Sequence, residues 1–219
     1  MNSRNSLTML ALLVASAAKA QMPGAPVLQN AWAAPGSVVA LDVGGGSGTG
    51  TSRGSTFAGA AAWAPAGGRF QLSIGAGMNS ASGSSSRAVY GVRAALPLKE
   101  MMGGNLGIAA FIGAGGGARS VTDSLRATAI VPVGLAIGYR WAVGAGGRGF
   151  SLYADPNYQY QSGPKNKKGY FRVGAGLDAG ITPRFGLTAG LESGATAAPG
   201  FVGPHGTQFG LGASIKLGR

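Results

Sequence analysis

Residues 125–141, LRATAIVPVGLAIGYRW, decide the fold of this chain. Every second residue from Leu125 onward is apolar or aromatic, and Arg126, Gly134 and Arg140 stand among the positions between them. A period of two is that of a β-strand whose two faces meet different surroundings. The segment therefore predicts a long strand with one apolar face and one face of small or polar residues.

The same alternation recurs before and after this segment, most clearly at residues 69–78, 87–98, 170–181 and 206–217. These runs exceed the average strand of about five or six residues, and they reach the roughly 9 to 11 residues that a tilted strand needs to cross a bilayer. Eight strands remain the alternative if residues 37–43 or another weak segment do not form one. We expect ten strands, at residues 37–44, 55–64, 69–78, 87–98, 105–117, 125–141, 149–161, 170–181, 184–194 and 206–217.

Turn signals separate the expected strands. Tight turns are expected at residues 65–68 and 182–183. If both chain ends lie on the periplasmic side, most of the longer connections fall on the outer side, which is the arrangement of outer-membrane barrels. The longer, more polar connections are expected at residues 44–54, 79–86, 162–169 and 195–205.

Aromatic residues lie near the ends of the expected strands. A transmembrane barrel carries a girdle of aromatic residues at each lipid–water interface, whereas the core of a soluble β-sandwich would place large rings at the strand middles. The sequence therefore predicts an all-β, antiparallel, transmembrane up-and-down barrel. The expected periplasmic girdle contains Trp63, Phe70, Tyr139, Trp141, Phe150 and Phe185, and the outer girdle contains Phe57, Tyr90, Tyr158, Tyr160, Phe171 and Phe209.

The composition narrows the class of protein further. Charged residues make up 11% of the chain, well below the roughly 25% of soluble domains. The 42 glycines follow no triplet period, which excludes a collagen triple helix. The absence of cysteine excludes a disulfide scaffold and a thiolate metal site. The net charge of +12 comes from scattered residues, so we expect contact with anionic lipid headgroups and no nucleic-acid partner.

The N-terminus has the pattern of a secretory signal peptide. Arg4 precedes an apolar run at residues 7–18, and residues 18–20 form a small-x-small cleavage site. We expect Sec-type export and cleavage after residue 20, and an uncleaved N-terminal anchor is the alternative. Residues 21–36 contain three prolines and predict a periplasmic lead-in, which leaves residues 37–219 for the barrel.

Several charged residues fall at inward positions of the expected strands. Buried charges persist when they are paired, so they predict a network of ion pairs that holds the barrel together. The alternative is a narrow channel with a weak preference for anions, since ten strands enclose only a small lumen. Pro132, also inward, predicts a bulge or kink. The expected network contains Asp42, Arg93, Arg126, Arg140, Asp155, Arg172, Asp178, Glu192 and Lys216.

Few residues point to chemistry. His205 and Thr207 resemble the His-x-Ser of outer-membrane lipid A deacylases, with Thr in place of Ser, although a solvated loop histidine is the simpler interpretation. Residues 113–118, GAGGGA, fit a dinucleotide-binding fingerprint only superficially, because no βαβ unit surrounds them. One histidine and no cysteine predict no transition-metal site, and we expect no cofactor. Lys165, Lys167 and Lys168 are candidates for contact with lipopolysaccharide phosphates; a solvated loop is the alternative.

The chain resembles the small bacterial outer-membrane β-barrel proteins over nearly all of its expected mature length. The expected last strand, FGLGASIKL at residues 209–217, is similar to the assembly signal of that group, whose members usually end in an aromatic residue. This chain ends in Leu217-Gly218-Arg219 instead. The resemblance implies location in the outer membrane and transient contact with the barrel-assembly machinery.

The group includes anchors, adhesins, small channels and lipid-modifying enzymes, so the fold does not choose among these functions. From the residues we expect a non-enzymatic protein with a structural or surface-interaction role. A narrow passive channel and a hydrolase that uses His205 and Thr207 are the alternatives.

Overall fold

The computed structural model describes residues 31, 36–47, 54–66, 69–81, 87–121, 124–142, 149–162, 167–194 and 207–217. These residues form ten β-strands and one short 3₁₀-helix, η3 (Met102–Gly104). None of the helices found in the described residues is long and apolar enough to span a membrane. The strands are β1 (Gly36–Ser47), β2 (Gly54–Ala64), β3 (Gln71–Ala81), β4 (Arg87–Met101), β5 (Leu106–Val121), β6 (Ser124–Ala142), β7 (Gly149–Ser162), β8 (Lys167–Gly180), β9 (Phe185–Gly194) and β10 (Thr207–Leu217).

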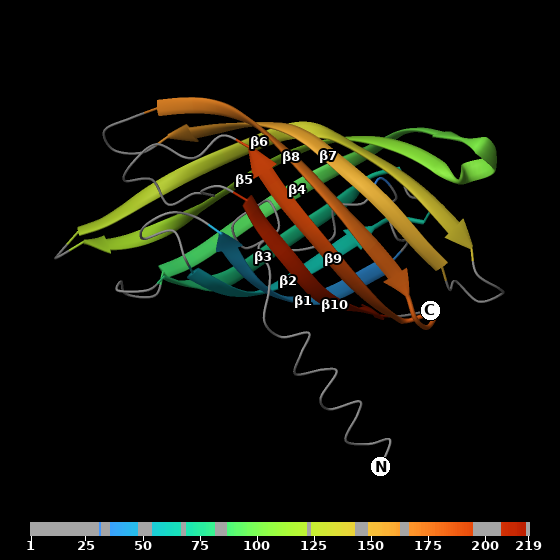
Figure 1. Ribbon diagram of the computed structural model, residues 1–219, viewed down its shortest axis with the longest axis horizontal. Coiled ribbons are helices and arrows are strands. Elements are labelled where there is room, and N and C mark those ends of the chain that lie inside the picture. Colours follow the sequence, from blue (N-terminus) through green and yellow to red (C-terminus); the bar gives the residue numbers. More distant parts are fainter. Residues whose placement is uncertain are drawn as a thin grey trace, which may run out of the picture.

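The ten strands form one closed barrel (Figure 1). Each strand pairs antiparallel with the next, and β1 pairs with β10, beginning with Ser37 opposite Leu217. Closure satisfies every strand edge by hydrogen bonding, which a sheet in lipid requires. The predicted all-β transmembrane barrel is therefore confirmed, with ten strands and not eight.

The first strand begins and the last strand finishes on the same side of the barrel, because the start of β1 pairs with the last residues of β10. We call this the terminal end, and the other the opposite end. On β6, Val133, Leu135 and Ile137 are exposed on the outer surface, whereas Ile130 and Ala136 are buried inside. An outward face of exposed large apolar side chains is what a surface bathed in lipid requires.

The irregularity expected at Pro132 differs from what the structure shows. The ladder between β5 and β6 is interrupted beside Pro132, but Ile112 still pairs with Val133 and Gly115 with Ile130, so no residue is inserted and no bulge forms. Pro132 lacks the N–H group that the ladder would use, which explains the gap. The register shifts instead between Pro97 and Lys99 of β4.

The two ends of the barrel differ less in the length of their connections than the sequence predicts. Only residues 122–123 link β5 to β6 at the opposite end, whereas residues 195–206 link β9 to β10 there. The reason is that β5 and β8 extend into segments that the sequence analysis assigned to connections. Residues 102–105 and 181–184 form short links at the terminal end, as expected for the inner side of such barrels.

The described residues of the two expected girdles lie towards the two ends of the barrel on the outer surface. At the terminal end two pairs of rings pack edge to face. The ring centroids of Trp63 and Phe70 are 5.6 Å apart, and those of Tyr139 and Trp141 are 4.6 Å apart. The side chain of Phe209 lies outside the described residues. The other expected girdle members are exposed or half-buried: Phe150 and Phe185 towards the terminal end, and Phe57, Tyr90, Tyr158, Tyr160 and Phe171 towards the opposite end.

Ala31 lies inside the barrel. It is buried against the inward side chains of Ala109, Phe111 and Ala136 on β5 and β6. Ala31 belongs to the segment that the sequence predicts to be a periplasmic lead-in, and its side chain packs against the inner face of β5 and β6. The rest of that lead-in before Gly36, the expected signal peptide and its cleavage site lie outside the described residues.

Candidate functional site

The inward face of β7 forms a polar row along the lumen. Successive inward positions carry a serine, a tyrosine, an aspartate, an asparagine and two glutamines, and every one of these side chains is buried. The outward positions between them include Leu152, Tyr158 and Tyr160, which are exposed. The alternation that faces lipid on one side of β7 therefore builds a polar wall on the other. The row consists of Ser151, Tyr153, Asp155, Asn157, Gln159 and Gln161.

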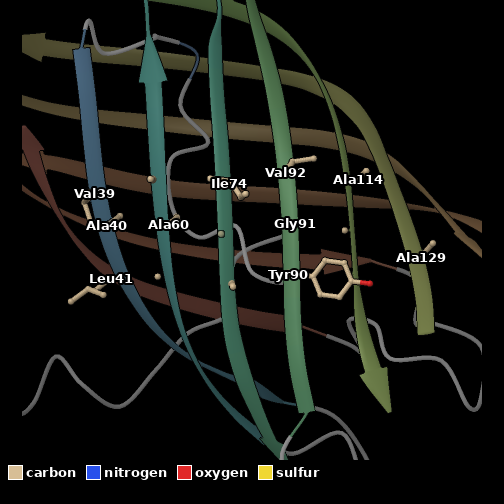
Figure 2. Close-up of a pocket in the computed structure, with 15 residues that line it drawn as sticks. Val39, Ala40, Leu41, Ala60, Ile74, Tyr90, Gly91, Val92, Ala114 and Ala129 are labelled. Atoms are coloured by element: carbon tan, nitrogen blue, oxygen red, sulfur yellow. The ribbon is translucent and has the colours of Figure 1, made fainter. Parts of the chain in front are cut away.

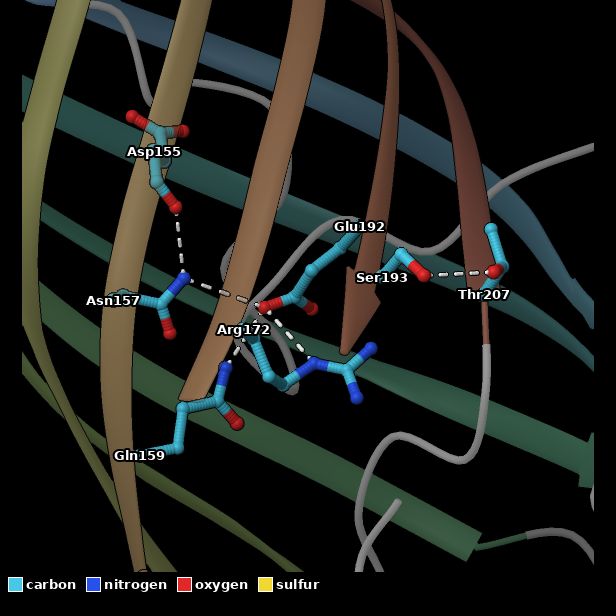
Figure 3. Close-up of polar contacts among 7 residues, drawn as sticks. All are labelled: Asp155, Asn157, Gln159, Arg172, Glu192, Ser193 and Thr207. Carbon is cyan, nitrogen blue, oxygen red and sulfur yellow. Dashed lines mark hydrogen bonds and ion pairs between the residues drawn. The ribbon is translucent and has the colours of Figure 1, made fainter. Parts of the chain in front are cut away.

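Near the opposite end, this row meets a buried ion pair (Figure 3). Arg172 Nε of β8 lies 3.2 Å from Glu192 Oε1 of β9, and both side chains are completely buried. The same Glu192 oxygen accepts hydrogen bonds from Gln159 Nε2 at 2.9 Å and from Asn157 Nδ2 at 3.5 Å. We call Asn157, Gln159, Arg172 and Glu192 the lumenal cluster.

The lumenal cluster ties three neighbouring strands together. Two buried charges are stable in a medium of low polarity only when they face each other and receive further hydrogen bonds. The two amides provide those bonds to Glu192, and Asn157 Nδ2 also donates to the backbone oxygen of Asp155 at 3.0 Å. All of these contacts to Glu192 converge on Oε1, while Glu192 Oε2 and the amide oxygens of Asn157 and Gln159 have no hydrogen-bond partner among the described residues.

Some polar atoms beside the cluster have no hydrogen-bond partner. They include both side-chain amide atoms of Gln161 and the hydroxyl group of Tyr170, which are buried in the part of the barrel that the structure describes. Buried polar groups without partners are rare in folded proteins. This end of the lumen therefore retains unused capacity to donate and accept hydrogen bonds.

Two further polar groups occupy the lumen. Asp178 of β8 accepts hydrogen bonds from Thr188 Oγ1 at 2.6 Å and from Ser151 Oγ at 3.3 Å. Arg93 of β4 stacks over the ring of Phe111 at 4.0 Å and interacts electrostatically with Asp155. Polar contacts therefore occur along most of the length of the β7 row.

The opposite wall of the lumen is lined by small residues. The inward positions of β2 whose side chains the structure describes are Ala58, Ala60, Ala62 and Ala64, and all of them are buried. On the neighbouring strand β1, the inward residues Val38 and Ala40 are also buried. Small side chains leave room for the long polar ones of β7–β9, so the two walls complement each other in size.

The structure places the charges that the sequence assigned to the lumen in three environments. Arg93, Asp155, Arg172 and Glu192 are buried, and Asp178 and Lys216 are half-buried. Arg140 is not in the lumen: it lies exposed at the terminal end against the β4–β5 turn, with Nη2 3.6 Å from Glu100 Oε2. Its position near the end of β6 lets its long side chain reach that turn. The side chains of Asp42 and Arg126 lie outside the described residues.

The sequence analysis missed the neutral members of the site. Tyr153, Asn157, Gln159, Gln161 and Tyr170 are buried beside the charged residues. The alternation of the sequence places all of them at the same inward positions as the charged residues. Long amide side chains at consecutive inward positions of β7 are the sequence feature that indicates the polar row.

The residues considered for hydrolysis do not form a site among the described residues. Thr207 Oγ1 lies 3.0 Å from Ser193 Oγ near the opposite end, and His205 falls outside the described part of the chain (Figure 3). No group of three potential metal-binding side chains occurs in the described ranges. Lys167 and Lys168 are exposed at the start of β8, and Lys165 lies outside these ranges.

A closed barrel with an apolar outer band and a polar lumen is the architecture of an outer-membrane β-barrel protein. No protein-family model matches the sequence, and no curated protein matches it. The fold is similar to the crystal structure of the beta domain of the Bordetella autotransporter BrkA, with a TM-score of 0.53, 16% identity, and coverage of 84% of this chain and 100% of that chain. The outer membrane phospholipase A of Escherichia coli also matches, with a TM-score of 0.36, 14% identity, and coverage of 84% of this chain and 91% of that one. At these identities the comparisons show the fold alone.

Proposed function

We propose that this chain is a non-enzymatic integral outer-membrane protein with a structural or surface-interaction role, and that its barrel does not conduct. The observation that carries the proposal is the complete burial of polar side chains on one wall of the lumen. Asp155, Gln161, Arg172 and Glu192 are completely buried, so no continuous aqueous path passes over this wall. Open aqueous pores occur in barrels of about 16 to 18 strands, which is well above ten.

The surface supports a role as a membrane anchor. At the terminal end Arg69, Lys99 and Arg184 are exposed, and at the opposite end Lys167 and Lys168 are exposed. Cations at both edges of an apolar band suit the phosphate groups on the two sides of a membrane. We infer that the terminal end faces the periplasm, that the lysines contact lipopolysaccharide, and that β10 engages the assembly machinery during insertion.

Conductance tests the proposal directly. The full-length protein, extracted in detergent and shown to be folded by a shift between unheated and boiled gel bands, would be added to planar bilayers. We expect no sustained single-channel steps, because water does not reach the buried polar side chains of this wall. Sustained steps that persist through purification would contradict the closed barrel and favour the narrow channel.

The non-enzymatic role has its own test. Cells that express the protein and cells that express His205→Ala would be compared for the acyl chains of their lipid A by mass spectrometry. We expect identical lipid A in both strains and in cells without the protein. A lipid A product that disappears with His205→Ala would establish the hydrolase.

A further inference from the structure

Both walls of the lumen are buried, although the wall on β1 and β2 carries small side chains. Ala40 and Ala60 stand side by side on that wall (Figure 2), and they are 1% and 7% exposed. On the far wall, Gln159 and Gln161 of β7 are at most 1% exposed. Side chains alone just fill a barrel of about eight strands, and this barrel has ten. The strands therefore do not account for the burial of both walls by themselves.

Ala31 is a buried residue on the inner face that comes from outside the strands. It is 3% exposed and packs in one cluster with Ala109 and Phe111 of β5 and Ala136 of β6. The guanidinium group of Arg93 lies over the ring of the same Phe111, 4.0 Å from its centroid. Ala31 thus lies among inward side chains of the barrel wall, and it brings the segment before β1 to the inner face.

The position of Ala31 also gives the direction of this segment. Gly36, the first residue of β1, lies at the terminal end. Ala136, in the cluster of Ala31, lies two residues from Gly134, and Gly134 pairs with Asn157 of the lumenal cluster. The chain from Gly36 back to Ala31 therefore leads from the terminal end into the barrel, towards the level of the lumenal cluster.

We propose that residues 21–35 form a plug inside the barrel, which is held at Ala31 and covers the polar row of β7. The proposal rests on the closed lumen proposed above and names the part of the chain that closes it. After the expected cleavage, residues 21–30 still precede Ala31, and an extended chain of that length spans up to about 33 Å. The row from Asp155 to Gln161 is about 20 Å long, so the segment is long enough to cover it.

The composition of the segment suits the wall that it would cover. Residues 21–35 contain no charged side chain, so they add no unpaired charge beside the ion pair of Arg172 and Glu192. Their three prolines disfavour a helix, so their backbone groups need hydrogen-bond partners from elsewhere. The amide group of Gln161 and the hydroxyl group of Tyr170 are buried and have no such partner among the described residues.

The connection at residues 195–206 is the competing occupant. It is the longest link between strands at the opposite end, and it follows β9, which carries Glu192 of the lumenal cluster. The segment before β1 is favoured because one of its residues, Ala31, packs against the inner face. The experiments below distinguish the two.

Thiol labelling of the folded protein tests the plug. The chain has no cysteine, so Ala60→Cys introduces a single thiol on the β2 wall of the lumen. In detergent, we expect a small charged thiol reagent to label Ala60→Cys more than about tenfold more slowly than Lys167→Cys, which is exposed at the start of β8. Deletion of residues 21–31 should remove most of this difference. Labelling of Ala60→Cys that stays slow after the deletion would overturn the proposal.

A second deletion serves as the matched control. Removal of residues 197–202 shortens the competing connection and leaves the segment before β1 intact. We expect Ala60→Cys to stay slowly labelled in this background, with the gel shift of a folded barrel in both deletion variants. If the second deletion exposes the thiol and the first does not, the connection covers the wall and the proposal falls.

Substitutions at Ala31 test the plug without any deletion. Ala31→Arg places a large cation in a contact that already holds the Arg93 side chain, so we expect it to expel the segment and to accelerate the labelling of Ala60→Cys. Ala31→Gly should leave the labelling slow. Equal rates in the two variants, both showing the gel shift, would refute the attachment at Ala31.

Conductance of the same variants separates this proposal from the proposed function. If the full-length protein conducts while Ala60→Cys is protected until residues 21–31 are removed, the plug stands and the non-conducting role fails. If the full-length protein does not conduct and the deletion changes neither conductance nor labelling, the non-conducting role stands and the plug is refuted.

Discussion

Single residues differ sharply in what they contribute, as two ion pairs of the same chemistry illustrate. Arg172–Glu192 is completely buried, whereas Arg140–Glu100 is about half exposed. We expect Arg172→Met to lower the free energy of unfolding by about 3–5 kcal/mol, because it leaves a buried carboxylate without its partner. Urea titration of the protein in lipid vesicles measures this change.

The exposed pair serves as the control for that measurement. We expect Glu100→Gln to change the free energy of unfolding by less than about 1 kcal/mol, because water solvates both of its charges. Similar losses for the two variants would show that the lumenal cluster is hydrated and not part of a packed lumen.

Gly176 is required by the tyrosine beside it. A Cβ atom at this position would occupy the place of the Tyr153 hydroxyl group, which lies over the glycine inside the barrel. We expect Gly176→Ala to destabilise the barrel by about 1–3 kcal/mol through overpacking. Gly59→Ala is the control, because its Cβ would lie 3.6 Å from the nearest atom, Leu41 Cδ2. Thermal unfolding in detergent, followed by the gel shift, compares the two.

Each strand has one face in lipid and one in the lumen, and β6 offers a test of this assignment. We expect Leu135→Arg, in the middle of the outward face, to cost about 2–4 kcal/mol of folding energy in vesicles, because a cation there lies deep in hydrocarbon. Leu217→Arg, at the terminal end of β10, should cost no more than about 1 kcal/mol. Equal costs would mean that β6 does not cross at the expected depth.

The strands could be predicted because the alternation of apolar and small or polar residues lies within each short segment of sequence. A period of two needs no knowledge of partners, so all ten strands and their faces follow from alternation, although several ends shift by a few residues. The lumenal cluster was only half predictable, because Arg172 and Glu192 stand out by charge while Gln159 and Gln161 do not. The bulge beside Pro97, the exposed position of Arg140 and the place of Ala31 depend on how distant segments meet, which alternation does not encode.

The whole molecule has an orientation that can be measured on intact cells. Lys167 is exposed at the opposite end and Lys99 at the terminal end. We expect a membrane-impermeant maleimide to label Lys167→Cys from outside and to leave Lys99→Cys unlabelled until the outer membrane is broken, since no native thiol competes. The reverse pattern would place the terminal end outside the cell.

The pairing of β1 with β10 has a consequence for the order of events in assembly. The seam joins Ser37 to Leu217 and continues to Ser47 opposite Thr207, so none of its hydrogen bonds can form before the last strand has been synthesised. Several residues that face each other across this seam are glycines, such as Gly44 opposite Gly210. The closure of the barrel therefore depends on backbone hydrogen bonds more than on side-chain packing. A chain that stops before β10 would present two open edges to hydrocarbon, where every unpaired group costs several kcal/mol. We therefore expect closure of this barrel to be all-or-none, so that a chain that stops before β10 does not form a smaller stable barrel.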